Sequence, residues 1–397
     1  MRITSLILYA LLLVAVISSC RRQDDYKKYI KNGEVLYTGK ADSLQVHSGR
    51  NRVQLTWLLI ADPKVSRSMI YWNNHRDSAA INIKRTSGVD TIRFFVNNLE
   101  ERAYTFEVYN FDKDGNISVK SEANGFVYGS FYEDALLSRA FSKAEMKNGN
   151  AEISWVNIDT TGGMIGMELQ YTSSDNVLHD TIVPAHPKDQ VTVLANYLSM
   201  STFSYRSLYM PDPAAVDTFY TKFETKNVKE DITAKYILNP GAPFDLDSQQ
   251  PFGGRFGQVK SWNYNSEAQR NGTYDNIGGQ GRLTLWIWDN GTITNGKIYQ
   301  TFTLPAGEYR FEADISNIDN TLENTYLVVA AGNNLPDVDQ VGTALGSARL
   351  RDNNTKYVSA GFSLTAPTTV TVGLLGTYTS PAEQTVRVNK VVLIRDK

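Results

Sequence analysis

Two tryptophans that alternate along an apolar run are the side chains best suited to hold a ligand. Residues 282–290 alternate as a strand does, with leucine and isoleucine side chains on one face and a second set on the other. That second set comprises Thr284, Trp286, Trp288 and Asn290. If only the first face is buried, the two indoles form a flat apolar surface on which the C–H face of a sugar ring can stack. The alternative is that a loop or a second sheet covers them, because a strand that is apolar throughout is often buried on both faces.

A second candidate group precedes that strand. It consists of Arg255, Trp262, Tyr264, Arg270 and Tyr274, set among Asn263, Asn265, Asn271 and Asn276. Loops at the edge of a sandwich often carry binding residues, and this one mixes aromatic rings with amide and guanidinium donors that suit hydroxyl groups. The alternative is a packed surface loop in which these side chains have only structural contacts.

Metal binding and catalysis have little support in the sequence. Asp245 and Asp247 are candidates for a structural calcium site, but two carboxylates fall short of the roughly six to eight oxygens that calcium needs. The four histidines lack zinc-ligand spacing, and no G-x-S-x-G motif occurs. Paired carboxylates for glycoside hydrolysis have few candidates in the C-terminal domain: Glu267, Asp275, Asp289, Glu308 and Asp314. We therefore predict that the protein is not an enzyme and needs no cofactor beyond a possible calcium ion.

The elements that would position these residues are short strands. From about residue 236 onward we expect strands over residues 282–288, 296–304, 307–315, 325–330, 359–364, 368–375 and 385–394. Glycine, asparagine and proline turns separate them, which predicts a jelly-roll or related β-sandwich. Residues 296–311, with the motif Gln300-x-Phe302-x-Leu304-Pro-Ala-Gly, and the closing run 386–394 resemble galactose-binding-like domains. That resemblance implies the fold more than the ligand.

The first half contains an internal repeat with a period of about 99 residues. Residues 52–57 correspond to 150–155, each an alternating run that ends in tryptophan, and residues 68–71 correspond to 168–171. Further matches pair Leu99, Tyr104 and Phe106 with Leu198, Phe203 and Tyr205. The pattern resembles fibronectin type III domains, in which a tyrosine hydroxyl at a strand corner bonds back to the backbone. Phe203 lacks that hydroxyl, so the second copy should be the more divergent one.

Together these patterns predict an all-β chain of three sandwiches. Two tandem immunoglobulin-like or fibronectin type III-like sandwiches span residues 35–128 and 129–228, and a jelly-roll, galactose-binding-like β-sandwich spans 236–397. The net charge of −2, with 21% charged residues, provides no basic field for nucleic acid or anionic lipid. No nucleic-acid partner is predicted.

The N-terminus predicts export and lipid anchoring. Arg2 precedes an apolar run over residues 6–17, which is shorter than the roughly 20 residues that cross a membrane. The run ends at Ser18, Ser19 and Cys20, as a lipoprotein signal over residues 1–20 would, and residues 21–34 would form a tether. An ordinary signal peptide is the alternative. Cys20 is the single cysteine, so the chain forms no internal disulfide.

An acidic pair, Asp24 and Asp25, follows Cys20, and here the chain resembles Bacteroidetes lipoproteins exported to the outer face of the outer membrane. With its fibronectin-like and galactose-binding-like halves, the whole chain resembles surface lipoproteins that accompany glycan importers. The resemblance implies a cell-surface, lipid-anchored protein that binds polysaccharide or oligosaccharide without catalysis. An outer-membrane importer and its lipoprotein partner would be its partners. The alternative is a structural or protein-interaction lipoprotein, an adhesin or an importer-docking protein, that binds no sugar.

Overall fold

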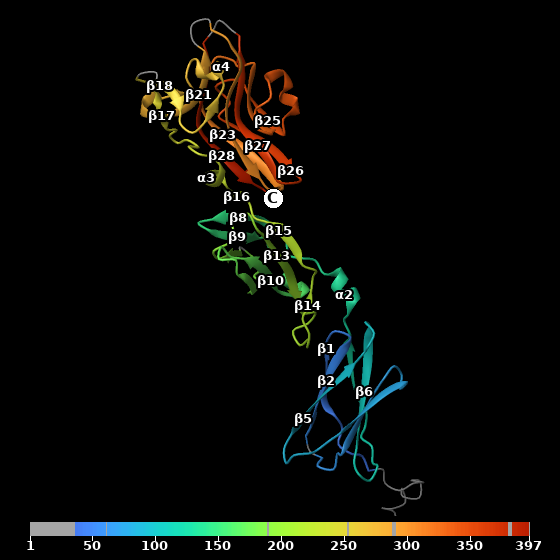
Figure 1. Cartoon of the computed structure of the whole chain (residues 1–397). Helices are drawn as coiled ribbons and strands as arrows, with labels where there is room; N and C mark the ends of the chain where they lie inside the picture. The colour runs from blue at the N-terminus through green and yellow to red at the C-terminus, as the bar shows by residue number, and fades with distance from the viewer. Residues whose placement is uncertain are drawn as a thin grey trace, which may run out of the picture. The chain divides into compact units, whose positions relative to one another are not determined.

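The computed structural model describes residues 36–60, 62–188, 190–251, 254–287, 291–379 and 383–396. Cys20 and the tether predicted over residues 21–34 lie outside these ranges, as do Trp288 and Asn290. Strands make up most of the described chain, with short helical turns between them (Figure 1). The prediction of an all-β fold is therefore confirmed. No helix in the described ranges is long and apolar enough to cross a membrane.

The chain forms two compact units. The first holds Met1–Leu136 and the later segment Tyr209–Tyr220, and the second holds Leu137–Leu208 and Thr221–Lys397. The second unit contains two sandwiches, whereas the first contains one.

The first sandwich consists of two antiparallel sheets. One has the order β1-β2-β5, with β1 (Asp42–Ser48), β2 (Arg52–Leu59) and β5 (Asp90–Asn97). The other has the order β4-β3-β6-β7, with β3 (Arg67–Trp72), β4 (Asp77–Asn82), β6 (Ala103–Phe111) and β7 (Ser121–Phe126). Alternate residues of β2 are buried, and Trp57 is among the largest buried side chains. A fully buried side chain of this kind contributes roughly 1.5–3 kcal/mol to folding.

A tyrosine closes one corner of this sandwich, as the sequence predicts. The Tyr104 hydroxyl accepts a hydrogen bond from the Glu100 backbone N–H at 3.1 Å, and Leu99 is buried beside it. The turn α2 (Ser130–Ala135) follows the sandwich.

The second sandwich repeats this plan. One sheet has the order β12-β9-β8, with β8 (Phe141–Lys147), β9 (Asn150–Trp155) and β12 (Val191–Leu194). In the other, β10 (Met164–Thr172) lies between β11 (Leu178–Pro184) and β13 (Thr202–Tyr209), and β15 (Glu224–Asn227) pairs with β13. The turn η3 (Thr160–Gly162) precedes β10, and β14 (Phe219–Tyr220) precedes β15.

One part of the predicted repeat is wrong by a single residue. Ile70 and Leu169 are both buried core residues, so residues 68–71 correspond to 167–170 rather than to 168–171. Tyr71 accordingly lies outside the core cluster, whereas Tyr171 lies inside it. A slip of one residue reverses the face of every side chain in a strand, which is why burial reveals an error that residue types alone conceal.

The C-terminal sandwich has a larger and a smaller sheet. The larger has the order β17-β18-β20-β21-β28-β23-β26, with β16 (Glu230–Asp231) pairing with β28. Its other strands are β17 (Leu246–Pro251), β18 (Phe256–Val259), β20 (Tyr274–Asp275), β21 (Arg282–Ile287), β23 (Gly307–Asp319), β26 (Tyr357–Leu364) and β28 (Gln384–Arg395). The smaller sheet, ordered β19-β22-β27-β24-β25, comprises β19 (Asn263–Tyr264), β22 (Ile293–Leu304), β24 (Asn324–Ala331), β25 (Gly346–Leu350) and β27 (Thr368–Tyr378). The helical turns are α3 (Thr233–Tyr236), α4 (Ser266–Gln269), η4 (Ile277–Gly279) and η5 (Val338–Thr343).

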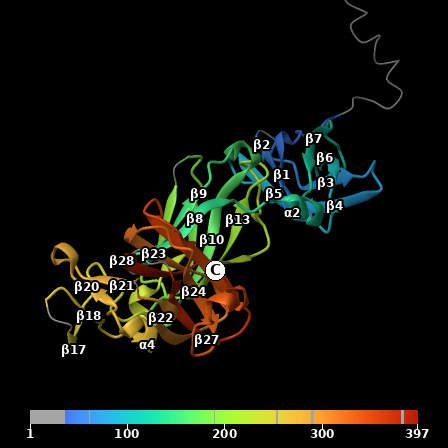
Figure 2. The ribbon, with the colours of Figure 1, turned by 90° about the horizontal axis from the view of Figure 1, so that it is seen from above.

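The seven strands predicted for this sandwich all occur, and most extend a few residues further than predicted. One apolar core fills the space between the two sheets. Figures 1 and 2 both show β21, β28 and β23 side by side in the larger sheet. These three strands present the face on which the candidate site lies.

Candidate functional site

The outer face of the larger C-terminal sheet carries the candidate site. Strand β21 places Leu283, Leu285 and Ile287 in the core, as its alternation predicts. Thr284 and Trp286 therefore belong to the opposite, outer face.

Trp286 is half-buried and belongs to a stack of side chains. Its ring stacks on the ring of Phe256, with 4.8 Å between the centroids and an interplanar angle of 20°. The guanidinium carbon of Arg255 lies 4.9 Å from the centroid of the Phe256 ring. The structure thus brings together Arg255 and Trp286, which the sequence placed in separate candidate groups, through a phenylalanine that was not predicted.

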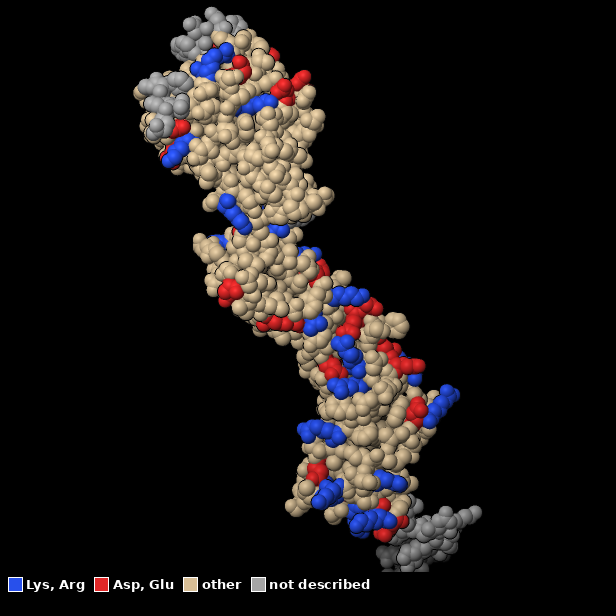
Figure 3. All heavy atoms as spheres, viewed as in Figure 1, with Lys and Arg blue, Asp and Glu red and all other residues tan. Residues whose placement is uncertain are grey.

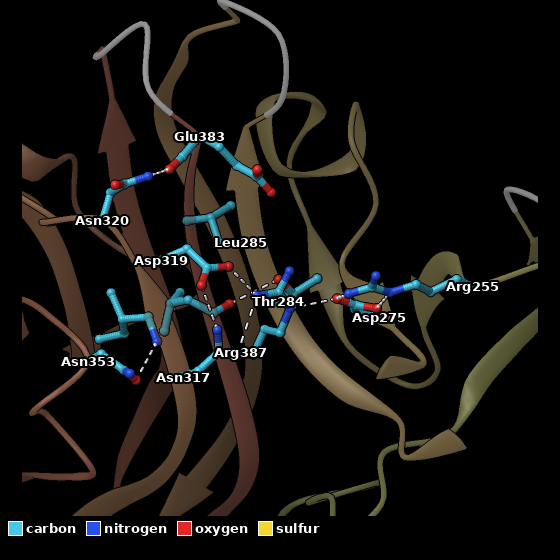
Figure 4. Close-up of polar contacts among 12 residues, drawn as sticks. Arg255, Asp275, Thr284, Leu285, Asn317, Asp319, Asn320, Asn353, Glu383 and Arg387 are labelled. Carbon is cyan, nitrogen blue, oxygen red and sulfur yellow. Dashed lines mark hydrogen bonds and ion pairs between the residues drawn. The ribbon is translucent and has the colours of Figure 1, made fainter. Parts of the chain in front are cut away.

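Arg255 also forms one end of an ion-pair network (Figure 4). Its Nε and Nη2 donate to the two carboxylate oxygens of Asp275 at 2.5 and 2.8 Å. Arg387 Nε donates to Asp275 Oδ2 at 2.6 Å, and Arg387 Nη1 donates to Asp319 Oδ2 at 2.5 Å. Asn317 Nδ2 donates to Asp319 Oδ1 at 2.9 Å. Two arginines and two aspartates therefore alternate along one chain of contacts.

Strand register explains why residues so far apart in sequence meet here. Phe256 of β18 lies opposite Asp275 of β20. Thr284 of β21 lies opposite Arg387 of β28, which in turn lies opposite Asn317 of β23. Because side chains opposite one another on paired strands share a face, the polar residues of four strands converge.

The centre of the network is buried and ionised. Burial alone would raise the pKa of Asp275, but hydrogen bonds from Arg255 and Arg387 outweigh burial and hold that pKa below its ordinary value. The hydrogen bond to Asp275 raises the pKa of Arg255. A buried ion pair is costly to desolvate and often contributes little net stability, so the network is a candidate for a functional role.

Both ends of the network reach solvent. The side chain of Arg255 is 43% exposed and that of Asp319 is 42% exposed, whereas Asp275 and Arg387 are buried between them. The face therefore presents a partly exposed guanidinium group at one end of the network and a partly exposed carboxylate at the other.

Three buried polar atoms beside the network have no hydrogen-bond partner in the described part of the chain. Two are Trp286 Nε1 and Thr385 Oγ1, whose residues lie opposite one another on β21 and β28, and Arg282 Nε on the same face of β21 is the third. Most buried polar atoms in folded proteins are hydrogen-bonded, so three exceptions on one face mark an unusual position.

Trp262 does not lie on this face, and the prediction that it belongs to an exposed binding loop is wrong. Its side chain is only 5% exposed and packs edge-on against Phe244, with 6.2 Å between ring centroids. Its indole Nε1 donates to the Asn239 carbonyl at 3.0 Å. Trp262 belongs to the apolar core between the two sheets, so the alternative of structural contacts holds for this residue.

Tyr274 and Tyr264 are also packing residues rather than surface ligand contacts. Tyr274 alternates with Asp275 on β20, and since Asp275 points outward, the Tyr274 ring is buried in the core. Tyr264 lies on β19 of the other sheet, where it packs against the same core, and burial raises its pKa.

Asp245 and Asp247 gain no further metal ligands. Among the described residues, no group of three or more histidine, cysteine, aspartate or glutamate side chains is placed to hold a metal ion. Asp245 is exposed, and its backbone N–H donates to Asn239 Oδ1 at 2.9 Å. The calcium site stays a prediction without a complete ligand set.

Sequence reasoning missed Phe256, Asn317, Asp319 and Arg387. Only the pairing of β18, β23 and β28 with the strands between them brings these residues together. One signal was present: Arg387 stands between two valines in the closing strand, and a charged residue in an apolar alternation faces away from the core.

The N-terminal half of the chain matches a known family. The family model DUF4998, described as a domain of unknown function, matches residues 20–219, which is half of the chain. The chain belongs to the DUF4998 family. A second model, DUF5013, also described as a domain of unknown function, matches residues 238–373 of the same chain. That match includes most of the candidate face, while Arg387 lies beyond its end.

Solved structures similar to the DUF4998 protein include fibronectin type III proteins. A two-domain fibronectin type III segment of chicken tenascin is 12% identical, with a TM-score of 0.19, over 47% of this chain and 97% of that one. The FN1–FN3 domains of chicken CNTN1 are 10% identical, with a TM-score of 0.30, over 49% and 69%. The chicken interferon gamma receptor alpha chain is 9% identical, with a TM-score of 0.20, over 47% and 97%. No curated protein matches the chain. Because these TM-scores are low, the fold assignment rests on the sheets themselves.

Proposed function

We propose that this protein binds a saccharide on the outer face of its C-terminal sandwich and does not transform it. The observation that carries the proposal is the stacked pair of Trp286 and Phe256, which lies beside the ion-pair network anchored on Asp275. A half-buried indole offers an apolar surface for the C–H face of a pyranose ring. The exposed parts of Arg255 and Asp319 offer a donor and an acceptor for its hydroxyl groups.

The state of Asp275 supports the non-catalytic part of the proposal. Both of its oxygens accept hydrogen bonds from arginine, and its lowered pKa keeps it ionised. A general acid must carry a proton near the working pH, and a nucleophile needs a free oxygen. Asp275 therefore binds and orients its neighbours rather than reacting.

The location proposed for the protein is the outer membrane, anchored by lipid on Cys20 and facing the cell exterior. There it would assist the capture and import of polysaccharide, alongside an importer and its lipoprotein partner. Mass spectrometry of the N-terminal peptide tests the anchor: acylated Cys20 is expected, and Cys20→Ser should move the protein from the membrane to the soluble fraction. Digestion by protease added to intact cells tests the orientation, and full resistance would contradict outward exposure.

Affinity electrophoresis through gels that contain single polysaccharides tests the binding function. The sample is the whole chain without residues 1–20, and at least one neutral polysaccharide should retard it. Trp286→Ala should reduce the affinity by about tenfold or more, because stacking on an aromatic ring and the energy of a tenfold change are of similar size. Arg255→Gln should weaken binding while leaving Asp275 paired with Arg387.

The matched control is Tyr357→Ala, which removes an exposed aromatic ring from β26 of the same sheet. It should bind as the natural sequence does. Retardation by no polysaccharide, or equal losses in Trp286→Ala and Tyr357→Ala with both variants folded, would overturn the proposal.

A docking role is the second candidate, and one observation favours it. Val191 and Val193, each 54% exposed, project from β12, which is an edge strand among the described strands of its sheet. Edge strands present unpaired backbone groups and can pair with another chain. If docking is the function, Val191→Lys with Val193→Lys should abolish co-purification with an importer complex, whereas Trp286→Ala should not.

A further inference from the structure

We propose that the first sandwich holds a separate binding site for ligands that carry a carboxylate or sulfate group. The site is an open hollow of about 540 Å³ between the β3–β4 turn and the start of β6. Small-molecule sites commonly have volumes in this range. The proposal is independent of the saccharide face on the C-terminal sandwich, since no residue is shared.

Arg102 forms one wall of the hollow and is held in place on two sides. Its Nη2 donates to Asn73 Oδ1 at 2.9 Å, and its guanidinium carbon lies 4.4 Å from the centroid of the Tyr104 ring. The Tyr104 hydroxyl is itself fixed by the Glu100 N–H. A guanidinium positioned in this way loses little side-chain entropy when its remaining N–H groups bind a ligand.

Arg76 supplies a second cation from the β3–β4 turn. It is exposed and lines the hollow, and within the described residues its guanidinium makes no hydrogen bond or ion pair. Two arginines that line one hollow can supply the planar, bidentate donors that suit a carboxylate or the oxygens of a sulfate.

Two carboxylates lie near this pair. Asp77 also lines the hollow and keeps its negative charge there, but it accepts a hydrogen bond from Asn73 Nδ2 at 2.5 Å and forms no ion pair with either arginine among the described residues. Glu100 lies 3.5 Å from Arg102, but its side chain is 84% exposed. An ion pair this open to water contributes little, so an incoming oxyanion can displace it.

The turn that carries Arg76 is rigid. Asn73, Asn74 and His75 all have positive φ angles, between 51° and 63°. The His75 ring stacks on Tyr71 with 4.5 Å between centroids, and its Nε2 lies 2.8 Å from Glu107 Oε2. These contacts hold a run of left-handed residues that would otherwise be unfavourable, and they stabilise the turn to which Arg102 is bonded.

Local geometry, rather than the overall field, would select the ligand. Figure 3 shows acidic and basic side chains interspersed over the visible face of the first sandwich. We therefore expect no general attraction of anions to this surface. The two arginines that line the hollow, Arg76 and Arg102, would select the anionic ligand.

Isothermal titration of the whole chain without residues 1–20 tests the proposal. Three probes are used: trigalacturonate, inorganic sulfate and neutral maltotriose. Trigalacturonate should bind about tenfold or more tightly than maltotriose in this hollow, as expected for charge-assisted hydrogen bonds. Arg102→Gln and Arg76→Gln should each remove most of this preference. Trp286→Ala should leave it unchanged, which separates this site from the saccharide face.

Arg93→Gln is the matched control, because it removes an equal charge from β5 of the opposite sheet of the same sandwich. It should have no effect. Inorganic sulfate can bind by itself or compete with trigalacturonate. If Arg76→Gln and Arg102→Gln weaken this sulfate binding too, the result supports the site and indicates sulfated ligands. The proposal is overturned if neither oxyanion binds. Equal losses in Arg93→Gln and Arg102→Gln, with both variants folded, would also overturn it.

Discussion

The two fibronectin-like sandwiches bury equivalent aromatic residues but satisfy their polar groups differently. In the first, the Tyr104 hydroxyl anchors a strand corner, while the buried Trp57 Nε1 has no partner among the described residues. In the second, Phe203 occupies the corner without a hydroxyl, and Trp155 Nε1 donates to Thr192 Oγ1 at 2.8 Å. The apolar pattern is thus shared, and the hydrogen bonds are specific to each copy.

A buried arginine takes over the anchoring role in the second sandwich. Arg139 Nε donates to the Val156 carbonyl at 3.1 Å, and Nη2 donates to the His186 carbonyl at 2.9 Å. The Arg139 carbonyl accepts from the Tyr205 hydroxyl at 2.9 Å. Burial lowers the pKa of Arg139. One side chain therefore ties together segments that are remote in sequence, whereas the first sandwich uses a bond between residues four apart.

Removing this arginine should break the second sandwich far more than any change at the first corner. Arg139→Met leaves the carbonyls of Val156 and His186, and the buried Gln190 Oε1, without their donor. We expect the free energy of unfolding of this sandwich to fall by about 3 kcal/mol, because several hydrogen bonds from one charged donor are lost together. Hydrogen exchange of β9 and β13 amides reports this sandwich separately from the others.

The matched control for Arg139→Met is Arg93→Met, which removes an exposed arginine from the first sandwich. An exposed substitution of this kind should change stability by less than about 0.5 kcal/mol. If exchange in β9 and β13 rises no more in Arg139→Met than in the control, the arginine is not the anchor that the contacts indicate.

A smaller effect is expected at the corner of the first sandwich. Tyr104→Phe makes this corner like that of the second copy and removes the acceptor for the Glu100 N–H. The loss should be about 1 kcal/mol, which is typical of one hydrogen bond. Exchange of the Glu100 amide should accelerate most. Tyr109→Phe, whose hydroxyl bonds to the partly exposed Glu107, should cost less; the reverse order would refute a stabilising corner.

Sequence pattern predicted the fold well because burial follows local alternation. Trp57 and Trp155 end matching runs, and both are buried as expected. The pattern failed for residues 168–171 because tyrosine is compatible with either face, so residue type alone did not fix the register. Ile70 and Leu169 were the reliable markers, since aliphatic side chains are the ones most consistently buried.

The candidate site was predictable only in part. Trp286 was found because strand alternation places it on the face opposite the leucines, and Arg255 because it lies in a loop that mixes aromatic, amide and guanidinium groups. Trp262 was assigned wrongly because the sequence does not show which side chains of a loop belong to the core. Arg387 and Asp319 were missed because sheet pairing, not sequence distance, brings them together.

The two sandwiches also differ in the connection that precedes their last strand. In the first, a tight turn satisfies itself: Asp112 Oδ1 accepts from the N–H groups of Asp114 and Asn116, each at 2.9 Å. In the second, the longer segment Tyr209–Tyr220 belongs by its contacts to the first unit. Within that unit Arg52 Nε and Nη2 donate to the two oxygens of Asp217 at 2.9 and 2.6 Å.

The attachment of this segment should weaken in acid, which is the smallest effect expected here. Hydrogen bonds from Arg52 hold the pKa of Asp217 below its ordinary value, although burial opposes them. A carboxyl group whose pKa is lower in the attached segment than in the detached one stabilises the attached state. This stabilisation is complete at pH values above the ordinary aspartate pKa of about 3.9. Its contribution is then lost as the pH falls through the lowered pKa. Exchange of the Val216 amide, which donates to the Ser48 carbonyl, should therefore accelerate below about pH 4 after correction for intrinsic rates.

Asp217→Asn supplies the control, because an amide does not titrate in this range. Its Val216 amide should exchange faster than in the natural sequence at neutral pH and should show no further change in acid. A hydrogen bond from Asn116 also lowers the pKa of Asp112. Amide exchange in the turn at residues 112–116 should therefore change with pH equally in Asp217→Asn and in the natural sequence. If Val216 in Asp217→Asn follows the same acid dependence as in the natural sequence, the segment is held by contacts other than the Arg52 pair, and the two connections differ in length alone.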